Sequence, residues 1–378
     1  MPNQIKIRRD TASNFQTENP TLGAGEFSLE TDTSKIKIGD GSTAYNSLQF
    51  IDGDAATALS SIVQGSSYAY SIGGVVSTGI NSSASLTDIQ RWSVTSDGNA
   101  SDIGDITQGR VAGASATSTT HGYVAGGLYA PPNARTNTIY KFAFTSPHTA
   151  TDVGNLTAPV FGNYGTSSPT HGYASGGRSP TTSPQYMTTH NKYAFASDGD
   201  ATDDGDLTVG RSNNGSGGNS SALASYFAGG YPDQPTVTAD VIDKIPFAAG
   251  GTATDIGNLT QGSNSINSGC NSIDNGYVVS MISAGGGVES SVNRIEKISY
   301  TSDGDAIDSQ DLFAGVYQSA GSSSTTSGYV SGGRRAPDSP VGSTYTNIIQ
   351  KFPFANTTTG TDVGDLATGL TYNHGNQS

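Results

Sequence analysis

A unit of about fifty residues recurs six times along this chain, and no other feature limits its possible folds as strongly. Three kinds of anchor mark each copy: an aromatic residue, a basic residue that opens an alternating stretch, and a D-x-G-D/N-L element or a close variant. The anchors are Tyr70, Tyr123, Tyr173, Tyr226, Tyr277 and Tyr329; Arg91, Lys141, Lys192, Lys244, Lys297 and Lys351; and Asp102, Asp152, Asp203, Asp255, Asp308 and Asp362. All three return with spacings of 50 to 54 residues, so chance does not explain them.

Each copy predicts four short strands. The first strand follows the D-x-G-D/N-L element, the second contains the aromatic anchor, and the third alternates in the manner of KFAF at 141–144. The fourth strand runs into the next D-x-G-D/N-L element, and an SDG turn at 96–98, 197–199 or 302–304 often precedes it. The single Trp92 falls in a third strand.

This order of glycine pair, variable loop, aromatic strand and short hairpin resembles kelch repeats. The resemblance covers about residues 60–378 and implies an all-β fold, a six-bladed β-propeller. The kelch tryptophan of the last strand is missing, and D-x-G-D/N-L stands in its place.

Glycine pairs close the second strand in five copies. We expect them to adopt turn geometry that other residues avoid and to let neighbouring backbones approach closely. They are Gly73 and Gly74, Gly126 and Gly127, Gly176 and Gly177, Gly229 and Gly230, and Gly332 and Gly333. The fifth copy reads GYVVSM instead, with its glycines at 285–287, so we expect a distorted loop there.

The two ends of the repeat region are complementary. The chain supplies only a second, third and fourth strand for the first copy, which begins at SYAYSIGG (67–74). After Leu366 it supplies one more first strand. We therefore expect the C-terminal strand to complete the first sheet beside Tyr70, which would remove exposed strand edges.

Residues 1–51 do not fit the repeat and predict a separate module, joined by a linker at 52–65 to a propeller at 66–378. The pieces IKIRR, GEFSLETDT and KIKIGDG resemble the N-terminal module of phage tail fibres and of the major tropism determinant family. That resemblance implies short β-hairpins, attachment to the virion and assembly as a homotrimer. A module this small also has little core of its own, which favours association.

Composition excludes several classes of protein. The formal net charge is −14, which argues against binding nucleic acid through its phosphates. A single cysteine, Cys270, excludes an intrachain disulfide. We see no signal peptide and no apolar run of membrane-spanning length, so we expect a chain made in the host cytoplasm without membrane insertion.

No catalytic, metal or cofactor site emerges from the motifs. His121 and His171 occupy the same repeat position, so we interpret them as turn residues and not as one cluster of ligands. The D-G-D/N turns indicate tight hairpins more than calcium sites, because each offers too few oxygens. We expect the repeated basic and acidic anchors to pair with each other, or the aspartates to accept backbone hydrogen bonds. We therefore predict that the protein is not an enzyme and needs no cofactor.

The loops after the glycine pairs vary most between copies and concentrate Pro, Tyr and Arg. Stiff loops with aromatic and guanidinium tips suit recognition, since little entropy is lost on binding. The candidate partner-binding residues are Tyr129, Arg135, Arg178, Tyr186, Tyr231, Arg334 and Arg335.

Together these features predict a bacteriophage virion protein, a tail fibre or tail-associated adhesin. Its N-terminal module would contact other virion proteins, and its propeller would bind a host cell-surface glycan or protein. Two alternatives stay open: a capsid or tail decoration protein without a receptor role, and a glycan-degrading propeller enzyme.

Overall fold

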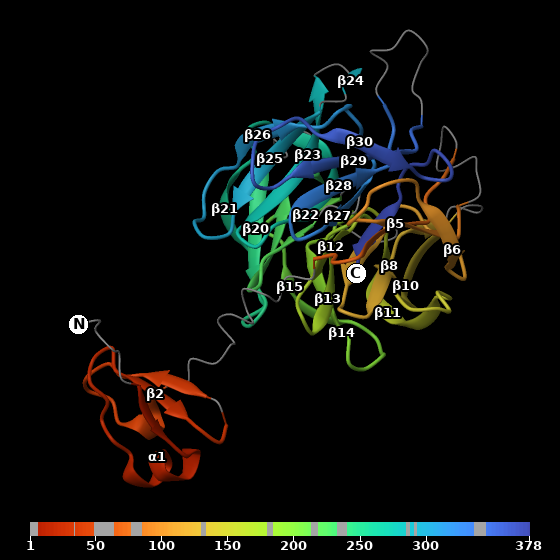
Figure 1. Cartoon of the computed structure of the whole chain (residues 1–378). Coiled ribbons are helices and arrows are strands. Elements are labelled where there is room, and N and C mark those ends of the chain that lie inside the picture. The colour runs from red at the N-terminus through yellow and green to blue at the C-terminus, as the bar shows by residue number, and fades with distance from the viewer. Residues whose placement is uncertain are drawn as a thin grey trace. The chain divides into compact units, whose positions relative to one another are not determined.

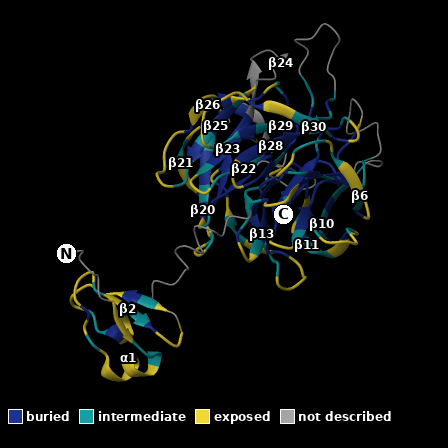
Figure 2. Cartoon of the chain, viewed as in Figure 1, coloured by how far each residue is buried: buried dark blue, intermediate teal, exposed yellow. Residues whose placement is uncertain are grey.

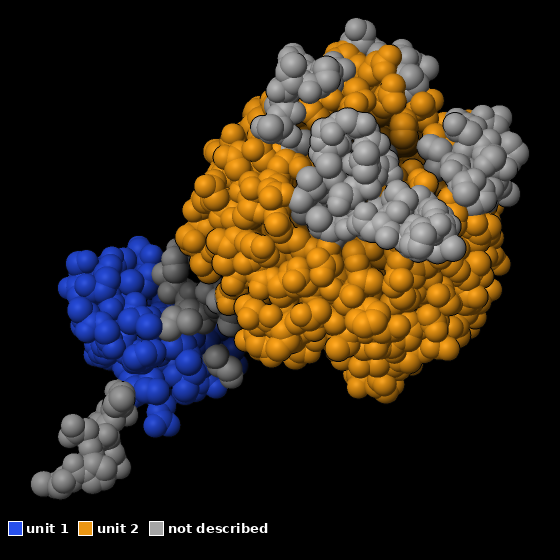
Figure 3. Space-filling model, turned by 90° about the horizontal axis from the view of Figure 1, so that it is seen from above, with its two compact units in different colours: residues 1–61 blue, residues 62–378 orange. Residues whose placement is uncertain are grey.

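The computed structural model describes residues 7–33, 35–48, 64–76, 85–129, 134–179, 184–212, 218–232, 240–284, 288–290, 293–335 and 345–378 (Figure 1). The chain divides into two compact units, residues 1–61 and residues 62–378, which Figure 3 colours separately. Most of the expected linker, at 52–63, lies outside the described residues. The two units are treated one at a time below.

Unit 1 combines a three-stranded sheet with a short helix. Its elements are β1 (Arg8–Asp10), α1 (Ala12–Glu18), β2 (Phe27–Glu30), β3 (Ile36–Ile38) and the 3-10 helix η1 (Tyr45–Ser47). The β2–β3 pair is the expected hairpin, and β1 pairs with β2 in parallel. The sequence analysis did not predict α1. The Thr11 hydroxyl caps this helix by accepting a hydrogen bond from the Asn14 N–H at 3.3 Å.

The core of unit 1 is partly polar. Phe15 stacks on Tyr45 with ring centroids 4.5 Å apart, and Leu22 is fully buried beside them. Buried Lys37 donates from Nζ to the Tyr45 carbonyl at 2.7 Å, and the Tyr45 hydroxyl donates to buried Glu30 at 3.1 Å. Burial and the hydrogen bond to Glu30 raise the pKa of Tyr45 to about 12. The charged residues of β2 and β3 therefore face inward.

Unit 2 contains, among its described residues, six antiparallel sheets with four strands in a row. In the order inner to outer strand, sheet 1 is β31 (His374–Gln377), β4 (Tyr68–Ile72), β5 (Asp88–Ser93), β6 (Ser101–Asp105); sheet 2 is β7 (Ala114–Thr117), β8 (His121–Ala125), β10 (Ala134–Ala143), β11 (Thr151–Val160); sheet 3 is β12 (Tyr164–Ser167), β13 (His171–Ser175), β14 (Thr189–Ala194), β15 (Thr202–Asp206); sheet 4 is β17 (Asn219–Ser220), β18 (Ala224–Ala228), β20 (Val241–Pro246), β21 (Thr254–Asn258); sheet 5 is β22 (Ser263–Asn271), β23 (Asn275–Ala284), β25 (Arg294–Ser299), β26 (Ile307–Asp311); sheet 6 is β27 (Ala320–Ser323), β28 (Ser327–Ser331), β29 (Ile348–Pro353), β30 (Thr361–Asp365). Short strands β9 (Leu128–Tyr129), β16 (Arg211–Ser212), β19 (Tyr231–Pro232) and β24 (Val288–Ser290) extend these sheets or pair beside them.

The register follows the repeat. In every sheet the aromatic anchor of the second strand lies directly opposite the basic anchor of the third strand, as Tyr123 lies opposite Lys141. The C-terminal strand β31 pairs with β4, with Asn376 opposite Tyr70. The expectation that the last strand completes the first sheet is thus confirmed.

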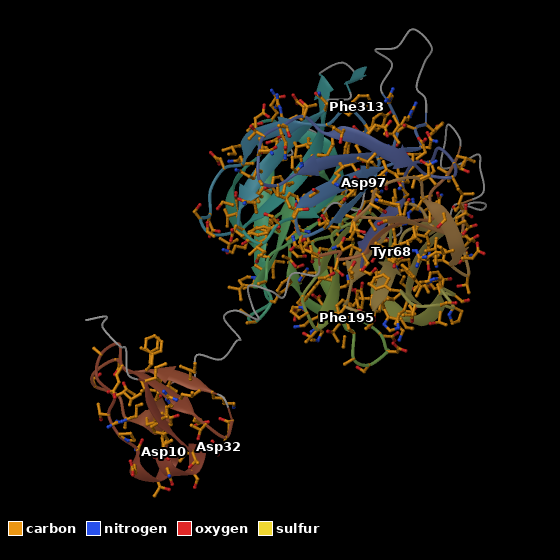
Figure 4. All side chains as sticks on the ribbon, in the orientation of Figure 1. Asp10, Asp32, Tyr68, Asp97, Phe195 and Phe313 are labelled. Carbon is orange, nitrogen blue, oxygen red and sulfur yellow. The ribbon has the colours of Figure 1, made fainter. Side chains whose placement is uncertain are left out.

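The aromatic anchors pack between sheets. Tyr123 of sheet 2 stacks on Phe195 of sheet 3 with centroids 4.8 Å apart, and Phe195 is labelled in Figure 4. Equivalent pairs join sheets 1 and 2, 3 and 4, 4 and 5, and 5 and 6. Tyr329 of sheet 6 donates its hydroxyl proton to the Val94 carbonyl of sheet 1 at 3.1 Å. Figure 2 shows the resulting buried interior of unit 2.

A chain of hydrogen bonds links the inner strands. Thr117 donates its backbone N–H to the Ser167 hydroxyl at 2.8 Å, and Ser167 donates in the same way to Ser220 at 3.0 Å. The pattern continues from Ser220 to Asn271, from Asn271 to Ser323 and from Ser323 to Gln377, at 2.9, 2.8 and 3.3 Å. The series thus ends at Gln377 in β31 of sheet 1. The neighbouring residue Asn376 accepts a hydrogen bond at 2.9 Å from the hydroxyl of Thr117, the residue of sheet 2 at which the series begins.

Glycine allows these close approaches. Gly126 and Gly127 have φ angles of 68° and 92°, and the other described glycine pairs are alike. The inner strands carry glycines that the sequence analysis did not single out. A Cβ on Gly165 would lie 2.0 Å from the Ser115 carbonyl oxygen, and one on Gly375 would fall 1.9 Å from that of Gly321.

The fifth sheet departs from the others. Its β22 and β23 are long, and their register shifts twice, between Ser263 and Ser265 and between Ile266 and Ser268. The glycine run at 285–287, where we expected a distorted loop, lies outside the described residues. Across the described part of the chain, no helix is long and apolar enough to span a membrane.

Candidate binding face

The predicted recognition loops are anchored beside the inner strands. After each glycine pair, the chain forms a bridge with the segment that leads into the first strand of the same sheet. Such bridges join Leu128 to Val111, Arg178 to Phe161 and Arg334 to Tyr317. The Phe161 N–H donates to the Arg178 carbonyl at 3.2 Å, and the Arg178 N–H donates back at 2.7 Å. These loops leave the strands at the ends opposite the third-to-fourth-strand hairpins; we call the described residues of this end the loop face.

Three of the predicted arginines lie over aromatic rings. The guanidinium carbon of Arg135 is 4.9 Å from the Phe161 ring centroid, and that of Arg178 is 5.4 Å from Tyr186. Tyr186 in turn stacks on Tyr231 with centroids 5.9 Å apart. Arg135, Phe161, Arg178, Tyr186 and Tyr231 therefore form a continuous band across sheets 2, 3 and 4, which we call the cation–aromatic band.

The remaining predicted residues lie elsewhere on the loop face. Tyr129 of β9 lies 5.7 Å from the guanidinium carbon of buried Arg110. Arg334 lies 5.6 Å from the ring centroid of Tyr317 in sheet 6, and Arg335 beside it is half-buried. Tyr129 lies opposite Ala134 in the β9–β10 pair, one residue before Arg135 of the cation–aromatic band.

Two arginines set the electrostatics of the band. Burial and the nearby charge of Arg178 lower the pKa of Arg135. The Nε–H groups of Arg135 and Arg178 are buried and donate to no partner among the described residues. Tyr231 is 45% exposed, which makes it an accessible ring at the end of the band.

Sequence reasoning missed Arg110 and Arg211, which occupy equivalent positions four residues after the Leu or Ile that ends a repeat. Arg211 donates from Nη2 to buried Asp243 at 2.8 Å. Arg110 is fully buried, but Tyr140 stands where sheet 4 has Asp243, 4.8 Å from the Arg110 guanidinium carbon. The other copies have Val160, Ser263, Val316 and Leu370 at this position, so the signal was a basic residue where the other copies are uncharged and mostly apolar.

The opposite ends of the strands carry ion pairs, but the lysines in them pair with carboxylates other than the repeat aspartates, so the first of our two expectations was wrong for these lysines. Lys141, Lys244 and Lys351 pair with Asp198, Asp303 and Asp97, which belong to the SDG hairpin of the next sheet. The second expectation, that the repeat aspartates accept backbone hydrogen bonds, is confirmed for five of them, which accept from a glycine N–H two residues later, as Asp102 does from Gly104 at 3.2 Å. The sixth, Asp308, forms an ion pair with Arg294 at 3.3 Å.

Lys141, Lys244 and Lys351 do not pair with the repeat aspartates because their carboxylate partners come from the hairpin of the next sheet. SDG hairpins occur only in sheets 1, 3 and 5. The corresponding hairpin of sheet 4 reads FAAGG and has no aspartate. Lys192 of sheet 3, which precedes sheet 4, instead pairs with Asp204 of its own sheet at 3.3 Å. Asp97 is labelled in Figure 4.

The histidines do not converge. His121 and His171 open equivalent strands, and each Nδ1 lies 2.8 Å from the hydroxyl of the preceding threonine. In the described part of the chain, no group of three or more His, Cys, Asp or Glu residues could hold a metal ion.

Unit 1 presents a second surface with an apolar character. Phe27 lies opposite Ile38 and Leu29 opposite Ile36, so these four side chains share the sheet face that α1 does not cover. Phe27 and Ile38 are each 39% exposed, and Ile7 beside them is 38% exposed. An exposed apolar face on so small a unit is typical of an association surface.

Comparison with known proteins bears on unit 1. Residues 5–43 match the family described as the major tropism determinant N-terminal domain. No curated protein matches the chain. The matched domain points to a protein of the phage tail-fibre or tropism-determinant type, and it fits a virion component.

Proposed function

We propose that this chain is a phage receptor-binding virion protein, in which unit 1 attaches to the particle and unit 2 presents its loop face to the host surface. The match of residues 5–43 to the tropism determinant domain supports the virion role. The predicted loop residues that come together in the cation–aromatic band support the binding role.

We further propose that unit 2 is a six-bladed, kelch-like β-propeller, with sheets 1 to 6 as its blades. The hydrogen bonds that run from Thr117 through the inner strands and return at Asn376 support this architecture. So does the packing of five of the six aromatic anchors against an aromatic ring of the following sheet. In a propeller, all loops after the second strands emerge on one side, which would give the loop face its breadth.

The proposed attachment includes self-association of unit 1 as a homotrimer through its apolar sheet face. Phe27 and Ile38 would be buried between copies, and about 25 cal/mol of stabilisation would accompany each Å² of apolar surface removed from water. Three copies on one particle would raise the apparent affinity of a weak loop-face contact through multivalency.

Host-cell adsorption tests the binding role. The full chain should sediment with host cells, and a variant with Tyr231→Ser, Arg334→Gln and Arg335→Gln should sediment at least tenfold less. The matched control carries Arg91→Gln on the hairpin side, where Arg91 lies over Tyr68, and it should adsorb like the parent. Equal adsorption of both variants would favour a decoration protein, and release of sugar from host envelopes would favour the enzyme.

A further inference from the structure

The cation–aromatic band holds two arginines that have no carboxylate partner in the part of the chain that the structure describes. Among the described residues, Arg8, Arg211 and Arg294 form ion pairs with Glu26, Asp243 and Asp308, but neither Arg135 nor Arg178 pairs with a carboxylate. Arg135 lies over the Phe161 ring, and the backbone of Phe161 is bridged to that of Arg178, so both arginines are neighbours of Phe161. Burial, together with the charge of Arg178, lowers the pKa of Arg135. Such an arrangement is unfavourable unless an anion joins it.

The rings hold both guanidinium groups in place. Arg135 lies over Phe161, and Phe161 is tied by two backbone hydrogen bonds to Arg178. Arg178 lies over Tyr186 and donates from Nη2 to the Gln185 side chain at 3.1 Å. Each arginine therefore has a fixed stem and free N–H groups, and little side-chain entropy is lost when an anion binds.

The geometry points to a carboxylated sugar as the ligand, and this inference rests on the proposed receptor-binding function. A planar carboxylate fits the donor fork of a guanidinium group, and the band offers two such groups, one over Phe161 and one over Tyr186. The exposed ring of Tyr231, stacked on Tyr186, offers an apolar platform beside them for the face of a sugar ring. We infer that Arg135 and Arg178 bind the carboxylate of an acidic sugar residue in a host-surface glycan, while Tyr231 contacts its ring.

The overall charge limits the length of this ligand. The chain carries a formal net charge of −14, so a long polyanion would be repelled beyond the band. The Debye length at physiological ionic strength is about 8 Å, which confines the attraction of two arginines to their immediate surroundings. One or a few acidic residues within a glycan therefore suit the site better than a highly charged polymer.

Titration with tri-galacturonic acid and with its carboxyl-reduced, neutral counterpart tests this inference on the full chain. We expect measurable binding of the acidic form by calorimetry or ligand-observed NMR, and at least tenfold weaker binding of the neutral form. Arg135→Gln and Arg178→Gln should each weaken binding of the acid at least tenfold, whereas Arg91→Gln should not change it. Added NaCl should weaken the wild-type interaction.

Several outcomes would overturn the inference. They are equal binding of acidic and neutral trisaccharides, no binding of the acid, or unchanged affinity in both arginine variants that keep the wild-type melting temperature. Host-cell adsorption separates this failure from failure of the proposed function. If the arginine variants adsorb like the wild type, the receptor role stands and the acidic sugar is wrong; if the wild type does not adsorb at all, the receptor role itself is wrong.

Discussion

The Nζ atom of Lys351 lies 3.0 Å from Oδ2 of Asp97, and the two residues are 254 positions apart in the chain. Lys351 belongs to sheet 6, the last in sequence, and Asp97 belongs to the hairpin of sheet 1, the first. The pair is about one-third exposed and equivalent to Lys141–Asp198 and Lys244–Asp303. The first and last sheets thus meet as consecutive sheets do elsewhere in unit 2.

Removal of this ion pair should cost little stability. We expect Lys351→Met or Asp97→Asn to lower the free energy of unfolding by about 0.5–1 kcal/mol, since exposed pairs are worth little. Burial alone would lower the pKa of Lys351, but the hydrogen bond to Asp97 raises it, and the net shift is upward. The contribution should therefore be complete below pH 10.5 and disappear as the pH rises through the higher pKa of the folded state. A double-mutant cycle by urea unfolding checks this, and additive effects of the two substitutions would contradict the pairing.

The C-terminal strand should be essential to unit 2. Deletion of residues 374–378 removes β31, exposes the edge of β4 and leaves Thr117 without Asn376. We expect a loss of melting temperature on the order of 10 °C, or aggregation of the truncated chain. Calorimetry of both proteins measures it, and an unchanged transition would contradict the role of β31 in sheet 1.

His374 should make the stability depend on pH. It is fully buried, its Nδ1–H donates to the Ile72 carbonyl at 3.0 Å, and its Nε2 accepts from the Gly113 N–H at 2.8 Å. Only the neutral ring can do both, and burial lowers the pKa of His374 to about 4. The unfolded chain takes up a proton near pH 6.5, so stability should fall between pH 6.5 and pH 4, by about 2 kcal/mol at pH 5.

The matched variant for this pH effect is His374→Gln, which cannot titrate. Its unfolding free energy should lie below that of the wild type at pH 7, and the gap should narrow by about 2 kcal/mol at pH 5. A gap of constant size at both pH values would show that His374 is not the responsible group. Urea unfolding at the two pH values provides the comparison.

Arg110 and Arg211 should respond oppositely to the same substitution. Arg211→Met would leave Asp243 buried without its cation, so we expect a loss of about 3–5 kcal/mol. Arg110→Met removes a buried charge that contacts the Tyr140 ring and the Gln108 side chain but forms no ion pair among the described residues, and the substitution should be neutral or stabilising. Equal losses in the two variants would contradict the difference in their environments.

The features that the sequence could predict are those that repeat. Alternation and spacing assigned the aromatic anchor to the second strand and the basic anchor to the third, and the missing first strand of the first copy predicted β31. The partner of each lysine was not predictable from its own copy, because Asp97, Asp198 and Asp303 come from the neighbouring sheet. The inner-strand glycines such as Gly165 escaped notice for the same reason: only packing against Ser115 shows why a side chain cannot fit.

The candidate site was predictable in part. The composition of the loops indicated Arg135, Arg178, Tyr186 and Tyr231 as candidates. Nothing in the loop sequences showed that Phe161, from the segment before β12, completes the band. In unit 1 the alternation of β2 and β3 indicated half-buried strands but not which face is covered. Lys37 is buried against Tyr45, so the apolar side chains of the sheet face outward. In most sheets the apolar face is the buried one.

That outward face makes the oligomeric state testable. Phe27→Ser combined with Ile38→Ser should convert a homotrimer into a monomer in light scattering, with the unit 1 core of Phe15 and Tyr45 left intact. Ser13→Ala on exposed α1 is the matched control and should leave the mass unchanged. A wild-type chain that is already monomeric would contradict the proposed trimer.

A reconstruction of the full-length protein by electron cryo-microscopy tests the proposed architecture most directly, because the common direction of the recognition loops depends on it. The account predicts six sheets around a narrow, polar centre, with residues 374–377 in the sheet of Tyr70 and Arg135 beside Arg178 on one side. An open arc of sheets, a ring of five or seven, or loops on both sides would contradict it.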